Sequence, residues 1–309
     1  MLNRYLTYYK PAMQFVVFCG IASMCLFFGA LMFEALATKA TGLSLSEINE
    51  MKTVTRELAR PLMLVNACAI LLTLLVPALL FAYLAYPGAT RYVGLAARPN
   101  TMWLVLGLLL MTAAIPFTGL LEEWCKHIPF FNASVASDEA YDKLALAMMQ
   151  GTNWSDLLLN SLCISLIPAL AEEIFFRGCL QQLLLNWFRS HKWLAILLVA
   201  ILFSAFHMQW SGFVPRVFLG LILGLAYYYS GSIWISISMH ALNNLLTIVL
   251  YFLFNRGILR TDWSTMPVSL PLGLTGAAGT GLLLYFLYRI RKPFPIYEVE
   301  KESEPALNS

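Results

Sequence analysis

The stretch 166–177 reads Leu-Ile-Pro-Ala-Leu-Ala-Glu-Glu-Ile-Phe-Phe-Arg, and it sets two adjacent glutamates inside an apolar run. On membrane-insertion scales, a charged side chain at a helix centre costs roughly 2.5–3.5 kcal/mol. Glu172 and Glu173, followed four residues later by Arg177, are therefore costly in hydrocarbon unless the fold uses them. The stretch predicts a membrane helix that contributes to a polar, functional interior.

The composition of the whole chain agrees with this. Its 309 residues are 60% hydrophobic and only 12% charged, and the mean hydropathy is +0.71, whereas soluble domains have about 25% charged residues. These values predict an all-α, polytopic membrane protein with an intramembrane polar cavity. The net charge of +3 comes without a basic stripe, so we expect no nucleic-acid partner.

The cysteines form no C-x-x-C pair, and we expect them to be packing residues: Cys19, Cys25, Cys68, Cys125, Cys163 and Cys179.

Eight apolar runs predict transmembrane helices, since a span needs about 20 residues. They cover approximately residues 11–36, 61–86, 101–121, 157–185, 193–210, 214–230, 232–254 and 270–290. We expect a single transmembrane domain over 1–291 and a disordered polar tail at 292–309. The first run is too long for a signal-peptide core and predicts a retained helix. The mixed-charge segment 37–60 predicts a short interfacial helix, and 122–156 is left open as a partner surface or a substrate lid.

Lys and Arg residues in the flanking segments nearly balance between the two sides of the membrane. Those assigned to the side of the N-terminus lie closer to the helix ends, notably Arg289, Arg291 and Lys292. Because cytoplasmic loops are enriched in Lys and Arg, we expect an integral protein of a bacterial inner membrane with both termini cytoplasmic. We also expect the polar cavity to open to the cytoplasm.

Three polar motifs lie in the predicted helices after residue 155. They are Glu172-Glu173-x-x-x-Arg177, Phe203-x-x-x-His207 and His240-x-x-x-Asn244. At about 1.5 Å of rise per residue, Glu172 and His207 each lie roughly 20 Å from the connection between their helices. His240 and Asn244 lie roughly 12–18 Å from the turn before their helix, on the same side of the membrane. The motifs are therefore predicted to meet at one depth.

Helical spacing assigns these side chains to faces. His240 and Asn244 point the same way, and Glu173 can pair with Arg177, because residues four apart share a face. Glu172 lies about 100° further round the helix and can meet a different partner. A carboxylate and an imidazole that share one water can remove its proton. A second imidazole with an amide can stabilise the resulting oxyanion.

The three motifs, in this order, resemble the CAAX prenyl protease and bacteriocin-processing family (CPBP, or Abi). Its members are intramembrane glutamic endopeptidases with an eight-helix core, and the resemblance covers about residues 155–255. It implies that Glu172 and His207 activate water and that His240 and Asn244 form the oxyanion pocket. It further implies supporting roles for Glu173, Arg177 and Phe203, a metal-independent mechanism without a cofactor, and a peptide or membrane-protein substrate.

Several other interpretations stay open at this point. Glu172, Glu173 and Arg177 fit a structural ion-pair network, and His240 with Asn244 fits hydrogen bonding between helices. Zinc is a chemical alternative, although H-E-x-x-H is absent and Asn is a poor ligand. At the level of the molecule, the alternatives are a catalytically silent scaffold or immunity-type protein, and a transporter or proton relay. The sequence leaves a stable protein partner open. We interpret Glu122-Glu123 near His127 as an interfacial helix end.

Overall fold

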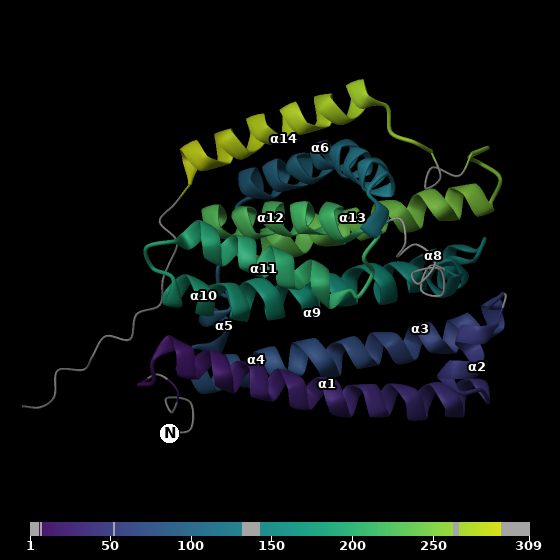
Figure 1. The fold of residues 1–309 in the computed structure, drawn as a ribbon, viewed down its shortest axis with the longest axis horizontal. Helices are drawn as coiled ribbons and strands as arrows, with labels where there is room; N and C mark the ends of the chain where they lie inside the picture. Colours follow the sequence, from purple (N-terminus) through teal and green to yellow (C-terminus); the bar gives the residue numbers. More distant parts are fainter. Residues whose placement is uncertain (1–5, 7, 52, 132–142, 262–265, 292–309) are drawn as a thin grey trace, which may run out of the picture.

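The structure is a computed structural model that describes residues 6, 8–51, 53–131, 143–261 and 266–291. The predicted tail 292–309 and part of segment 122–156 lie outside the described residues. Every long regular element in the described part is a helix, and the helices run side by side along one axis (Figure 1). The protein is thus an all-α, polytopic membrane protein.

Seven helices in the described ranges are long and apolar enough to cross a membrane. Two of them are continuous rods composed of several segments: Arg56–Ala85 (α3, η2 and α4) and Trp154–Trp187 (α8 to α10, with η3 and η4). The other five are α1 (Pro11–Thr41), α6 (Thr101–Lys126), α12 (Phe213–Ser230), α13 (Ile233–Asn255) and α14 (Leu270–Ile290). Two short helices, α2 (Leu45–Glu50) and α5 (Ala89–Tyr92), lie in the connections. Each of the seven long helices corresponds to a run predicted from the sequence.

The eighth predicted run, 193–210, forms a helix that is too short to cross. Helix α11 (Lys192–Phe206) has 15 residues, or roughly 22 Å, against a hydrocarbon core of about 30 Å. The chain turns directly after it: His207 is the C-cap, and Met208 has a left-handed φ of 57°. Helix α12 then runs back, so α11 and α12 form a hairpin whose turn comprises residues 207–212.

The rods contain three π-helical stretches, and two of them are explained by proline. Proline has no amide hydrogen, so the carbonyl four residues before it loses its helical partner. Pro77 follows η2 (Leu71–Leu75), and Pro168 follows η3 (Ser161–Leu166). The third stretch, η4 (Ile174–Gln181), begins directly after Glu173. The two glutamates therefore lie at the end of a short α-helical segment, α9 (Ile167–Glu173), between two π-helical stretches, which are frequent at functional sites.

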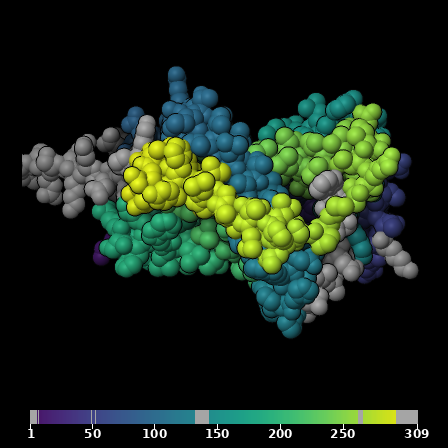
Figure 2. All heavy atoms as spheres, turned by 90° about the horizontal axis from the view of Figure 1, so that it is seen from above, coloured from purple at the N-terminus to yellow at the C-terminus, as the bar shows by residue number. Residues whose placement is uncertain are grey.

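The helices form layers that enclose the middle of the bundle. Helices α1, α3 and α4 cover one side, α6 and α14 cover the other, and α9 to α13 lie between them (Figure 1). Helix α14 crosses close over α6 (Figure 2), where a Cβ on Gly276 would lie 3.0 Å from the carbonyl oxygen of Ala113. On the opposite side, the Phe18 ring of α1 lies 4.9 Å from that of Phe175 in η4. All three polar motifs lie in the enclosed middle layer.

Candidate active site

A fully buried ion pair forms the floor of the site. Arg177 Nη1 lies 2.7 Å from Glu173 Oε1, and both side chains have 0% exposure. His240 Nδ1 lies 2.9 Å from the same carboxylate oxygen, and Arg177 Nη2 donates to the Gly220 carbonyl at 3.2 Å. A buried pair offsets the cost of leaving water only when further hydrogen bonds satisfy it. These additional bonds tie η4 to α12 and α9 to α13.

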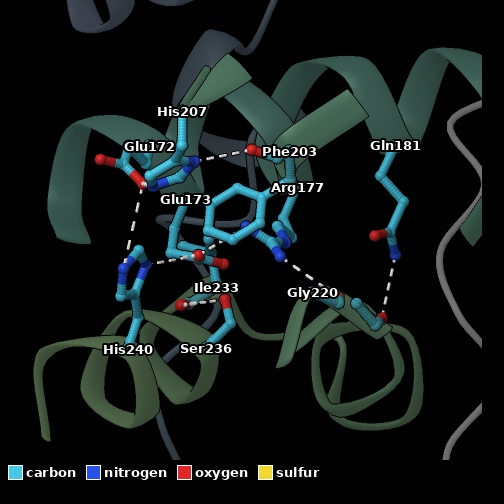
Figure 3. Close-up of polar contacts among 11 residues, drawn as sticks. Glu172, Glu173, Arg177, Gln181, Phe203, His207, Gly220, Ile233, Ser236 and His240 are labelled. Atoms are coloured by element: carbon cyan, nitrogen blue, oxygen red, sulfur yellow. Dashed lines mark hydrogen bonds and ion pairs between the residues drawn. The ribbon is translucent and has the colours of Figure 1, made fainter. Parts of the chain in front are cut away.

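Glu172 faces two imidazoles rather than the ion pair. Its Oε2 lies 3.9 Å from His207 Nε2 and 3.9 Å from His240 Nε2, as Figure 3 shows. This oxygen is buried, and no described residue donates a hydrogen bond to it. A separation of 3.9 Å is too long for a direct hydrogen bond and matches polar groups that a single water can bridge. The Glu172 side chain is 13% exposed, against 0% for Glu173.

Both imidazoles are oriented by acceptors on their other nitrogen. His207 Nδ1 lies 2.8 Å from the carbonyl oxygen of Phe203, and His240 Nδ1 faces the Glu173 carboxylate. Carbonyl and carboxylate oxygens only accept, so both Nδ1 atoms are the donors. In each ring the nitrogen that can gain or lose a proton is therefore Nε2, which points at Glu172.

Phe203 packs at the centre of these groups. Its ring lies 4.3 Å from the Arg177 guanidinium carbon, which sits over the ring face. The same ring makes edge contacts with both imidazoles, at 5.0 Å from His207 and 5.7 Å from His240. Phe203 thus fixes the cation and both histidines relative to one another.

The imidazoles open onto a cavity of about 80 Å³. Its lining combines polar and apolar side chains: Met111, Phe203, His207, Arg216, Leu219, Leu223, His240, Asn243 and Asn244. Asn244 lies in this wall, and its Oδ1 accepts a hydrogen bond from Asn243 Nδ2 at 3.3 Å. Asn244 therefore presents its amide nitrogen as the remaining donor.

The structure brings the predicted residues together but changes two details. The sequence placed His207 inside a span, whereas it caps the shorter helix α11 at the hairpin turn. Spacing predicted separate partners for the two glutamates, yet His240 lies between them and faces both. The i,i+4 rule assigns faces within one helix. It cannot predict that a side chain from another helix, here His240, lies between two residues that are neighbours in the sequence.

Sequence reasoning missed two polar residues of the cavity wall, Asn243 and Arg216. Asn243 follows His240 at i+3, a spacing that shares a helix face. Arg216 was counted as a flanking charge, although a charge within four residues of an apolar helix start is a signal for a polar site. Its guanidinium donates to the side-chain oxygen of Gln209 at 3.3 Å and also to the Gln209 carbonyl, which closes the hairpin turn.

The fold and the site define a class of protein: a multi-pass helical membrane protein with carboxylates and imidazoles enclosed at one depth. Residues 154–246 match the family model described as type II CAAX prenyl endopeptidase Rce1-like. This match contains all the motif residues, is consistent with the CPBP resemblance, and supports a peptidase of the CAAX protease type. No curated protein matches the chain, and no solved structure does. In the described ranges, no three His, Cys, Asp or Glu side chains are grouped as metal ligands would be.

Proposed function

We propose that this chain is an intramembrane endopeptidase that hydrolyses a peptide bond with water activated by Glu172 and His207. One observation supports it above the others: Glu172 Oε2 lies 3.9 Å from the Nε2 atoms of both His207 and His240. A purely structural role requires only the Glu173–Arg177 ion pair. It does not explain why the Glu172 carboxylate faces two oriented imidazoles.

In the proposed reaction, one water lies between Glu172 and His207 and attacks the substrate carbonyl carbon. Its proton passes to the Glu172 carboxylate or to His207 Nε2, which acts as general base. The oxyanion that forms is stabilised by the Asn244 amide and by His240 as a second hydrogen-bond donor. The intermediate then collapses, the C–N bond breaks, and the stored proton goes to the departing amine. The products are a carboxylate and an amine.

His240 lies between the two carboxylates of the cluster. Its Nδ1 is 2.9 Å from Glu173 Oε1, and its Nε2 is 3.9 Å from Glu172 Oε2. In this proposal Glu173 orients and stabilises the oxyanion donor, and Arg177 prevents Glu173 from becoming an uncompensated charge.

The first test is the isosteric substitution Glu172→Gln, with His207→Ala as a second variant. Loss of a general base lowers the rate by about 10²–10⁴-fold, and we expect this loss in hydrolysis of a genuine substrate by purified protein. The substrate can be found by comparing the protein termini of wild-type cells with those of Glu172→Ala cells. Glu123→Gln is the matched control, because Glu123 is a carboxylate paired with Lys126 at a helix end and should leave the rate unchanged.

A catalytically silent scaffold of the same fold gives the opposite result. If Glu172→Gln and His207→Ala insert normally and preserve the cellular phenotype, the role of the protein does not depend on hydrolysis. A zinc peptidase would lose activity when treated with a chelator. The proposed mechanism predicts the same rate with and without the chelator.

A further inference from the structure

The cavity beside His240 is closed at one end of the bundle. Its inner wall is formed by Met111, Phe203 and Leu223, all of which are buried. Behind this wall lies a second buried layer. Gln182 Nε2 donates to the Tyr227 hydroxyl at 3.0 Å and to the Tyr92 carbonyl at 3.3 Å. We call the end of the bundle beyond this layer, which contains α5 and the connection 188–191, the sealed end.

At its other end the same cavity is accessible. Asn243, Asn244 and Arg216 are partly exposed there, and the His207 side chain is 29% exposed. The hairpin turn next to them is more exposed still, with Met208 at 64%. Helix α13 continues past Asn244 to Asn255, roughly 16 Å further, whereas α11 has already ended at Phe206. The short hairpin therefore leaves a recess, with the site at its base.

The two ends of the bundle differ in charge. The basic residues of the sealed end are Lys10, Arg91, Arg98, Arg189, Lys192, Arg289 and Arg291, and no Asp or Glu lies there among the described residues. At the recess end, basic residues are as numerous but lie among acidic ones, as in the Arg56–Asp156 and Lys126–Glu123 pairs. The cytoplasmic leaflet is negatively charged and attracts Lys and Arg by about 1 kcal/mol each near the surface. The sealed end, where α1 begins and α14 ends (Figure 1), has the larger net positive charge and is the one that fits the cytoplasmic surface.

We infer that the substrate reaches the site from the extracytoplasmic face of the membrane. This inference rests on the proposed function and names the substrate class: a loop or terminus of a membrane or exported protein that lies outside the cytoplasm. It reverses the sequence-based expectation of a cavity open to the cytoplasm. The sequence placed the polar residues at one depth, but the direction of the opening depends on where α11 stops.

Thiol labelling tests the direction of access without requiring catalysis. Met208→Cys places a thiol on the exposed hairpin turn, and His191→Cys places one on the exposed connection of the sealed end. The parent chain with its own six cysteines sets the baseline. We expect a membrane-impermeant maleimide to label Met208→Cys in intact cells and His191→Cys only after permeabilisation. Labelling of His191→Cys in intact cells, or no gain for Met208→Cys there, overturns the inference.

A second arm separates this inference from the proposed function. Each cysteine is also introduced into the Glu172→Gln chain, whose labelling should match that of the active chain. If labelling agrees but no peptide is cleaved, the direction of access holds and the peptidase proposal fails. If cleavage occurs and the termini that change between wild-type and Glu172→Ala cells lie in cytoplasmic segments, the peptidase proposal holds and the direction fails.

Discussion

At the scale of single residues, the site separates two carboxylates that are neighbours in the sequence. Glu173 is bound on one oxygen by Arg177 and His240 at 2.7 and 2.9 Å. Glu172 Oε2 lies 3.9 Å from the Nε2 atom of each imidazole. Two direct contacts hold one oxygen of Glu173, whereas Glu172 Oε2 faces its imidazoles across a gap that a water can bridge. Burial and hydrogen bonding thus give identical side chains different surroundings.

The Glu173–Arg177 pair gives a prediction on stability. Removing one partner leaves a buried charge, which costs about 3–5 kcal/mol, so Glu173→Leu and Arg177→Met should each lower the midpoint of thermal unfolding in detergent. The double variant removes both charges and should regain most of the stability. It should remain inactive because His240 has lost its acceptor. A double variant as unstable as either single one would contradict this account.

Phe203 gives a second prediction, on positioning. Phe203→Leu retains apolar bulk but removes the contact with the Arg177 guanidinium, worth about 0.5–2 kcal/mol, and both imidazole edge contacts. We expect kcat to fall by about tenfold for a loss of 1.4 kcal/mol, with KM little changed. Phe206→Leu is the control. Phe206 lies on the same helix as Phe203 but packs against Phe175 and Phe176. Equal effects of the two substitutions would show that Phe203 only packs.

At the scale of elements, the sequence predicted the membrane helices well and their ends less well. Hydropathy identified all seven long spans, and the three motifs identified the catalytic candidates. Hydropathy could not show that α11 ends at Phe206, because residues 193–206 are as apolar as those of a spanning helix. The stop depends on the left-handed turn at Met208 and on the closure of that turn by Arg216. Both involve contacts between segments, which local patterns do not encode.

The α6–α14 contact gives a prediction at this scale. Gly276→Ala places a Cβ 3.0 Å from both the Ala113 carbonyl oxygen and Pro116 Cβ. Overpacking of this kind typically costs about 1–3 kcal/mol. We expect a lower unfolding temperature and, because α6 also contributes Met111 to the cavity, a lower rate of hydrolysis. Gly281→Ala on the same helix is the control, since nothing lies within 4 Å of its added Cβ. If both variants behave like the parent, close packing at Gly276 is not needed.

At the scale of the whole molecule, the two ends of the bundle differ in how far they are closed. One end is closed by buried glutamine and tyrosine side chains, and at the other end the cavity beside His240 lies next to the exposed turn of a short hairpin. A hydrolase inside a membrane needs both features, because water must reach the substrate carbonyl without a continuous path from one side to the other.

This asymmetry predicts the pattern of hydroxyl-radical labelling in purified protein. Met208 and Trp210 lie on the exposed turn and should be oxidised rapidly, whereas Tyr92 and Tyr227 are buried and should be protected. Trp193, exposed at the sealed end, shows that the reagent reaches that end of the molecule. Oxidation of Tyr227 as fast as Trp193 would mean that water passes the buried layer. In that case the cavity would be continuous with both faces, and the direction of substrate access could not be assigned to the recess alone.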